Sequence, residues 1–123
     1  MLFRSAGHVV ICDRFADSSV VYQGVARGLK GPLVRELNRI ATGGLKPHRT
    51  IVLDLDPRIG LARVGSRGTF DRIEKEALGF HQAVRSGFRR LAREEPRRVR
   101  LVDATRSQEH IHEAILRQLG DLL

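Results

Sequence analysis

The chain has 123 residues, enough for one compact domain and too few for two. Apolar residues make up 41% and charged residues 29%, a balance typical of a globular protein with a core of its own. A single cysteine excludes an internal disulfide framework, and no apolar run reaches the length of a membrane span. Together these features favour a reducing, cytoplasmic setting.

The net charge is +8, and 19 of the 22 basic residues are arginines. Guanidinium groups suit phosphate recognition because their planar fork can hold two oxygens at once. GC-rich coding DNA explains the overall arginine bias better, so only the positions of individual arginines count as evidence. A basic chain could also be a nucleic-acid-binding module, although one Tyr, five Phe and no Trp leave few aromatics to interleave with the charges.

The first predicted element is a buried strand at residues 8–12 (HVVIC), which makes Cys12 a small buried residue. Helices are predicted at 18–24 and at 32–41, the second with a proline in its first turn and a Gly-Gly pair after its end. A second buried strand follows at 50–55 (TIVLDL).

The second half begins with a short helix at 57–64, for which Asp56 is a plausible N-cap. A loop rich in Gly and Arg precedes a long helix at 73–95, whose apolar residues recur every three or four positions and therefore share one face. Four arginines give this helix a basic side, which is predicted to face solvent: Arg85, Arg89, Arg90 and Arg93. A strand at 99–102 (VRLV) and a helix at 107–122 complete the chain.

Strands that alternate with helices predict an α/β fold, with a parallel sheet flanked by helices. Three parallel strands make a poor sheet on their own, because both faces need cover and both edges stay open. The sequence is therefore expected to be the later part of a larger α/β domain.

An Asp-Arg pair, Asp13 and Arg14, follows the first predicted strand at the end where open α/β sheets place ligands. Asp13 could hold a metal-bound water or orient a phosphate, and Arg14 could clamp phosphate oxygens. For the dipeptide alone, a local ion pair at the end of a strand is the better explanation.

The longer segment around this pair, residues 13–28 (DRFADSSVVYQGVARG), resembles the DR(Y/F/H)-x-x-S-x-x-A-Y-Q-G stretch of thymidylate kinases. The resemblance implies that Arg14 contacts the thymidylate phosphate. It also implies that Asp13 helps to place magnesium, through water, and the transferred phosphoryl group.

The same match implies roles for three residues of the predicted helix at 18–24. Ser19 and Gln23 match positions that hydrogen-bond thymine, and Tyr22 matches the aromatic residue that leaves little room for a 2′-hydroxyl. Val21 stands where the family usually has Ala. From the residues alone, Tyr22 could instead be a core aromatic and Ser19 an ordinary helix serine.

Residues 62–76 (ARVGSRGTFDRIEKE) combine flexible glycines with arginines, which suits a loop that closes over a polyphosphate. An isolated basic loop of this kind is more often a solvated turn. The segment resembles the lid of thymidylate kinases of the enterobacterial type, which carry their catalytic arginines there. This resemblance makes Arg67 and Arg72 candidates for contact with the transferred phosphoryl group, and Arg63 and Arg67 candidates for ATP binding.

The turn after the last predicted strand (VDAT) matches the D-A-(T/S) turn that lies beside the adenine of ATP in the family. It makes Asp103, Ala104 and Thr105 candidates for ATP binding. By itself such a turn is a weak signal, because Asp and Thr are common at helix starts.

The resemblance covers nearly the whole chain and implies a P-loop nucleoside-monophosphate kinase fold. No G-x-x-x-x-G-K-[ST] motif occurs, so we expect a single domain over 1–123 that lacks the family's N-terminal strand and P-loop. Residues 1–5 match no part of the family pattern and are expected to be non-native. The implied full-length enzyme transfers the γ-phosphoryl of ATP to dTMP with Mg²⁺, is a cytoplasmic homodimer and binds neither membrane nor nucleic acid. This fragment is expected to be inactive alone. Another nucleotide or deoxynucleoside kinase remains the alternative within the class.

Overall fold

The computed structural model describes residues 2–64 and 72–123. Its elements are, in chain order, α1 (Leu2–Ser5), α2 (Ala16–Ser19), the π-helix η1 (Val20–Ala26), α3 (Gly31–Thr42), β1 (Thr50–Asp54), α4 (Pro57–Val64), α5 (Arg72–Glu94), β2 (Val99–Asp103) and α6 (Gln108–Leu119).

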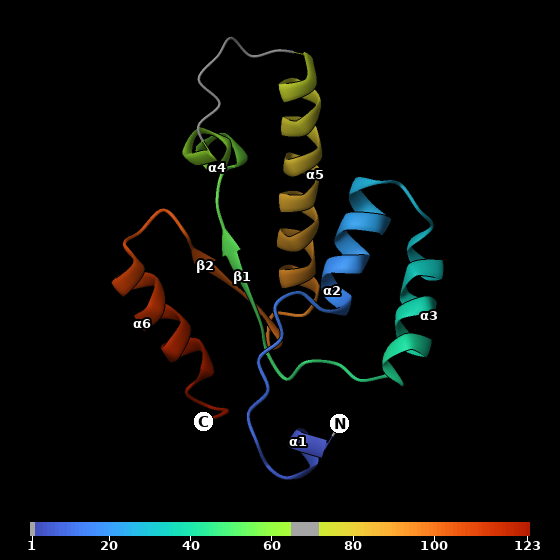
Figure 1. Cartoon of the computed structure of the whole chain (residues 1–123), viewed down its shortest axis with the longest axis vertical. Helices are drawn as coiled ribbons and strands as arrows, with labels where there is room; N and C mark the ends of the chain where they lie inside the picture. Colours follow the sequence, from blue (N-terminus) through green and yellow to red (C-terminus); the bar gives the residue numbers. More distant parts are fainter. Residues whose placement is uncertain (1, 65–71) are drawn as a thin grey trace.

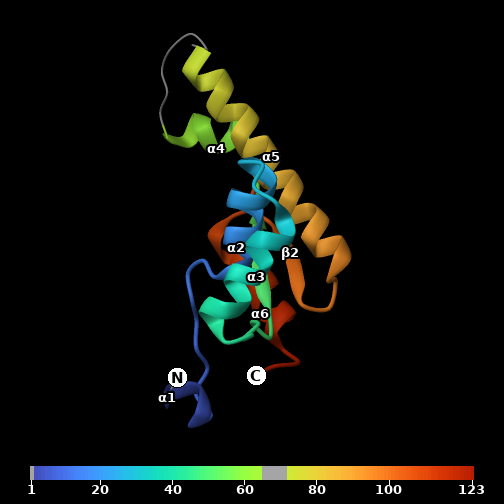
Figure 2. The ribbon, with the colours of Figure 1, turned by 90° about the vertical axis from the view of Figure 1, so that its right-hand side faces the viewer.

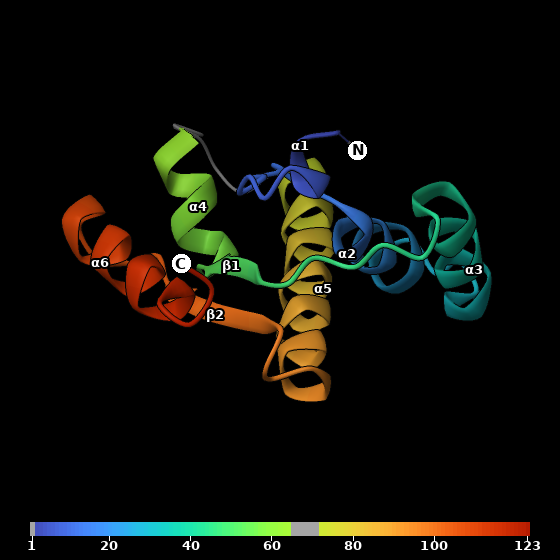
Figure 3. The same cartoon turned by 90° about the horizontal axis from the view of Figure 1, so that it is seen from below.

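The two strands lie side by side and run parallel, from Thr50 opposite Val99 to Asp54 opposite Asp103. α6 lies on one side of the strands, whereas α5, α2 and α3 lie on the other (Figures 1 and 3). Both α5 and α6 contact β2, and Val99 and Val102 are buried there. The predicted α/β fold class is therefore confirmed, as are the strands predicted at 50–55 and 99–102.

Local signals in the sequence explain where several helices begin and end. Gly43 adopts the left-handed conformation (φ 61°) after α3, and its N–H is donated to the last turn of that helix. The Asp56 carboxylate accepts a hydrogen bond from the Arg58 N–H at the start of α4 (2.9 Å), as an N-cap does. Ser107 accepts from the His110 N–H at the start of α6.

The predicted strand at 8–12 is wrong. This stretch is extended coil, and its side chains are open to solvent: Ile11 is 92% exposed and Cys12 is also exposed. A strand needs a neighbour to satisfy its backbone hydrogen bonds, and the described sheet contains only β1 and β2. Figure 2 shows this segment and α1 extending away from the helices.

The predicted helix at 18–24 exists, but its winding changes along its length. A short α-helical turn, α2, passes directly into η1, where the Arg27 N–H donates to the Tyr22 carbonyl oxygen, five residues earlier (3.2 Å). Such π-helical segments are rare and are often found at functional sites. Within the described residues, every helix is too short or too polar to span a lipid bilayer.

The long helix α5 packs its predicted apolar face against η1 and the sheet, with Val84 buried. Its basic side is not wholly solvated, contrary to the expectation for four arginines. Arg85 reaches back over the end of β1 and pairs with Asp54 (2.8 Å). The helix therefore meets the sheet through charges as well as through apolar contacts.

Candidate functional site

Arg14 is the one described residue other than glycine with a left-handed backbone (φ 62°). This conformation is unfavourable for a side chain with a Cβ and persists only where the surroundings impose it. The Arg14 guanidinium lies over the ring of Tyr22, 5.1 Å from its centroid. Backbone strain and a cation–π contact therefore coincide at a predicted phosphate-binding residue.

Tyr22 is half-buried, and its ring meets two phenylalanines of α5. The ring centroids lie 5.9 Å from Phe80 and 6.3 Å from Phe88, both within the range of favourable aromatic contacts. Tyr22 is thus packed against the protein by Phe80 and Phe88, and it supports Arg14 as well. The core-aromatic explanation and the binding explanation are compatible with this position.

The other predicted site residues of this region differ in exposure. Ser19 is half-buried at the end of α2, whereas Gln23 and Asp13 are exposed. In the part of the chain that the structure describes, Asp13 and Arg14 make no ion pair, so the simple ion-pair explanation finds no support there. Asp13 and Gln23 therefore present polar groups to solvent. In the sequence Asp13 is next to Arg14, and Gln23 is next to Tyr22.

A partly buried charge network that sequence reasoning missed holds this region against the sheet. The carboxylate of Asp17 accepts hydrogen bonds from Arg98 (2.7 and 2.9 Å) and from the Thr50 hydroxyl (2.7 Å). Arg98 also pairs with Glu95 (2.7 Å). Burial opposes ionisation of Asp17, but the hydrogen bonds from Arg98 and Thr50 outweigh it, so the pKa of Asp17 is lowered. No local pattern reveals this network, because its members lie far apart in the sequence.

A second charge cluster lies where β1 ends. Arg85 donates two hydrogen bonds to the Asp54 carboxylate (2.8 and 3.1 Å) and lies 3.6 Å from Asp56. Arg89 adds a longer contact to Asp54 at 3.5 Å. The hydrogen bonds from Arg85 lower the pKa of Asp54. Arg85 and Arg89 lie four residues apart on α5, and this spacing could have suggested that they share a partner. The sequence did not identify Asp54 as that partner.

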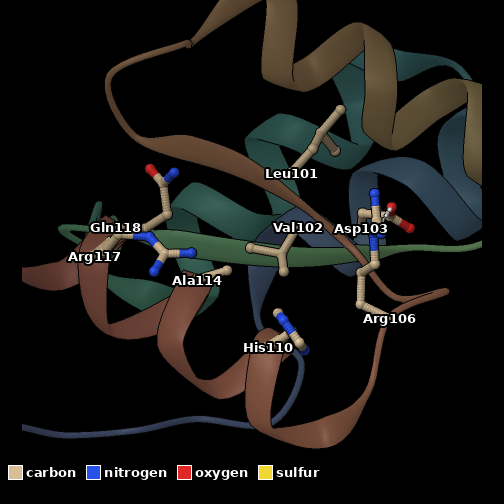
Figure 4. Close-up of a pocket in the computed structure, with 8 residues that line it drawn as sticks. All are labelled: Leu101, Val102, Asp103, Arg106, His110, Ala114, Arg117 and Gln118. Carbon is tan, nitrogen blue, oxygen red and sulfur yellow. Dashed lines mark ion pairs between the residues drawn. The ribbon is translucent and has the colours of Figure 1, made fainter.

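The VDAT turn has a defined geometry. The Asp103 carboxylate accepts hydrogen bonds from the Thr105 hydroxyl (2.6 Å) and from the Thr105 N–H (2.9 Å), which lower the pKa of Asp103. An open pocket of about 270 Å³ lies beside this turn, between β2 and α6. Figure 4 shows His110 and Ala114 of α6 beside Val102 of β2, with Arg106 paired to Asp103 (3.4 Å). Ala104, the next residue in this turn, is buried.

The predicted lid is only partly visible. Arg67 lies outside the described residues, and Arg72 begins α5 with a side chain that also lies outside them. Arg63 is exposed in the last turn of α4. The roles predicted for Arg67 and Arg72 therefore stay predictions.

Magnesium can be tested only against the donor groups near Arg14. Among the described residues, no group of three or more His, Cys, Asp or Glu side chains could hold a metal ion. Mg²⁺ commonly takes one or two carboxylates together with waters and substrate phosphates, and the exposed Asp13 carboxylate fits that demand. The role predicted for Asp13, to meet a hydrated magnesium ion through water, stays a prediction.

The fold and these groups together indicate which class of protein this is. Polar and charged groups gather where β1 and β2 end, and the Arg14–Tyr22 pair follows the extended apolar segment at residues 8–12. The sequence model of the thymidylate kinase family matches residues 4–115.

Curated relatives agree with this match. The chain is 54% identical over 117 residues to the thymidylate kinase of Symbiobacterium thermophilum, covering 95% of this chain and 54% of that protein. It is 50% identical over 109 residues to that of Deinococcus radiodurans, covering 89% and 53%. With the thymidylate kinase of Gloeobacter violaceus it shares 53% identity over 113 residues, covering 90% and 53%. This chain belongs to the thymidylate kinase family, and it spans about half the length of these relatives.

Proposed function

We propose that this chain supplies the thymidylate side of a kinase that transfers the γ-phosphoryl of ATP to dTMP. The observation that supports this most directly is the Arg14–Tyr22 pair, held by a strained backbone within the segment that resembles the family pattern. A guanidinium stacked on an aromatic ring is already oriented, so it can bind phosphate with little loss of side-chain freedom.

In this proposal each residue has a separate task. Arg14 binds the phosphate of dTMP, and Tyr22 lies against the deoxyribose, where a 2′-hydroxyl would be crowded. Ser19 and Gln23 hydrogen-bond the thymine base. Asp13 meets hydrated magnesium and helps to orient the phosphoryl group. Magnesium, when bound, neutralises charge on the transferred phosphates.

The ATP side is assigned on the resemblance. Asp103, Ala104 and Thr105 form the turn proposed to lie beside adenine, next to the pocket between β2 and α6. Arg63 and Arg67 are proposed to contact ATP, and Arg67 and Arg72 to stabilise the transferred phosphoryl group. ATP is the co-substrate.

We further propose that residues 1–123 form one domain that corresponds to the later part of the family fold. The chain's span of about half of its relatives and the lack of a phosphate-loop motif support this proposal. The whole enzyme is proposed to be a cytoplasmic homodimer.

The proposal is tested by joining residues 6–123 to the preceding part of the Symbiobacterium relative and assaying dTMP, dCMP and dUMP with ATP and magnesium. We expect dTMP to be preferred and the chain alone to show no turnover. Arg14→Ala should lower kcat/KM strongly, and Arg67→Ala should lower kcat on the order of a thousandfold. Arg35→Ala, an exposed change on α3, is the control. Near-normal kinetics for Arg14→Ala, or robust turnover by the chain alone, would contradict the proposal.

A further inference from the structure

Gly87 lies at the closest approach between α5 and η1. A Cβ at this position would lie 2.9 Å from Cγ1 of Val21 and 3.3 Å from Cγ1 of Val25. The shorter of these distances is below any normal carbon–carbon contact, so an added methyl group requires something to move. Glycine is therefore required here for lack of space, since its backbone is ordinary helix.

The side chain of Val21 cannot easily move aside to make room for an added methyl group. Its side chain is only 1% exposed, which makes it one of the two most completely buried large side chains described. Valine is also branched at Cβ, so it has one strongly preferred rotamer in a helix and few alternatives. An added methyl group on α5 would therefore displace the backbone of η1 rather than the tip of a flexible side chain.

Displacement of η1 would move Tyr22, the next residue after Val21. The Tyr22 ring contacts Phe80 and Phe88, which lie seven residues before and one residue after Gly87 on the same helix. The Arg14 guanidinium lies over the same Tyr22 ring. The position of Tyr22 against the two phenylalanines thus depends on how closely η1 approaches α5.

We propose that Gly87 is a positioning residue: by letting η1 approach α5, it sets the place of Tyr22 and of the Arg14 guanidinium stacked on it. Gly87 acts only through Val21 and Tyr22 and touches no nucleotide. The consequence for thymidylate binding rests on the proposed function, whereas the consequence for the position of Tyr22 does not.

The side chain at position 21 sets how much room there is at position 87. An alanine at position 21 would remove the Cγ1 atom that an added Cβ at position 87 meets at 2.9 Å. The two positions are therefore complementary in size: glycine at 87 accommodates valine at 21. A compensating pair of substitutions should restore the approach that a single substitution blocks.

The chain contains its own probe, because Tyr22 is its sole tyrosine and it has no tryptophan. Near-UV circular dichroism and tyrosine fluorescence of the 123-residue chain therefore report on Tyr22. Four proteins are compared with the unaltered chain: Gly87→Ala, Val21→Ala, the double variant V21A/G87A, and Gly79→Ala. Gly79 lies on α5 with nothing within 4 Å of an added Cβ, so it is the matched control for helix propensity.

We expect Gly87→Ala to change the near-UV and fluorescence signals of Tyr22 while far-UV circular dichroism shows the helices retained. Affinity for dTMP, followed by Tyr22 fluorescence, should fall about tenfold in Gly87→Ala. Gly79→Ala should leave both measurements unchanged. The double variant should recover both, which a general loss of stability would not do.

Two results would overturn the inference that Gly87 places Tyr22. The first is an unaltered Tyr22 signal in Gly87→Ala, and the second is an altered signal that V21A/G87A fails to restore. An altered and restored Tyr22 signal with unchanged dTMP affinity would overturn the consequence proposed for thymidylate binding. Should Gly87→Ala fail to fold, Val21→Ala alone decides, since the extra space must then shift the Tyr22 signal. Failure of the unaltered chain to bind dTMP would count against the proposed function, while the Tyr22 signals and their rescue would still decide the place of Gly87.

Discussion

Residues 8–12 and residues 99–103 carry similar β-branched sequences, yet only residues 99–103 form a strand in the structure. Val99 and Val102 are buried in β2, whereas Val9, Val10 and Ile11 are 60–92% exposed in extended coil. β2 has β1 beside it and helices on both sides, while residues 8–12 lie next to no described strand. A strand-like sequence therefore specifies a strand only where a neighbour completes its hydrogen bonds.

The two regions also differ in what fixes their ends. β2 is preceded by Arg98, which ties it to Asp17 and Glu95. Residues 8–12 lead into Asp13 and Arg14, which are both exposed, and the Arg14 guanidinium lies over the Tyr22 ring rather than pairing with a strand residue. The network at Asp17 is thus the place where the N-terminal region is fastened to the sheet.

The largest expected effect comes from removing the ion pair between Arg98 and Asp17. Arg98→Ala should lower the free energy of unfolding by about 3 kcal/mol, because it leaves the partly buried Asp17 carboxylate without its main partner. Urea unfolding followed by circular dichroism measures the change. Arg97→Ala is the control, since Arg97 is exposed and contributes its backbone carbonyl to the contact with Arg49. Equal stability of the two variants would show that the network does not fasten the region.

A smaller effect compares the two strand-like segments directly. Val99→Ala should lower the free energy of unfolding by about 2 kcal/mol through lost burial and a residual cavity. Ile11→Ala removes more carbon from the chain but should change stability by less than about 0.5 kcal/mol, because Ile11 is exposed. The same urea measurement serves both variants. A cost for Ile11→Ala that matched Val99→Ala would mean that residues 8–12 are packed in solution.

The contrast between residues 8–12 and 99–103 also explains which secondary-structure elements could be predicted from the sequence. The strands at 50–55 and 99–102 and the helices were predictable because their periodicity and caps are local, as Gly43 and Asp56 illustrate. The strand at 8–12 was mispredicted because its partner is not a property of its own residues. The π-helical winding at Tyr22 and the exposure of Cys12 were likewise not visible locally.

The candidate site was predictable to the extent that its residues form a continuous motif. Arg14 and Tyr22 are eight positions apart, and the structure brings them into contact as part of one segment. The partners of Asp17 and Asp54 lie on distant elements, so no spacing rule could find Arg98 or Arg85. Long-range charge pairing is the component of this site that only the fold reveals.

The smallest expected effect concerns the loss of stability in acid that the Asp17 carboxylate causes. The pKa of Asp17 is lower in the folded chain than its usual value, since hydrogen bonds from Arg98 and Thr50 outweigh the cost of burial. Its contribution to stability is therefore complete above about pH 4, and it is lost as the pH falls through the lowered pKa. Asp17→Asn should flatten the fall in unfolding free energy below that pH, as measured by urea unfolding at a series of pH values. If Asp17→Asn kept the same fall in unfolding free energy as the unaltered chain, the ionised Asp17 carboxylate would not be what ties the N-terminal region to the sheet, and the contrast between the two regions would fail.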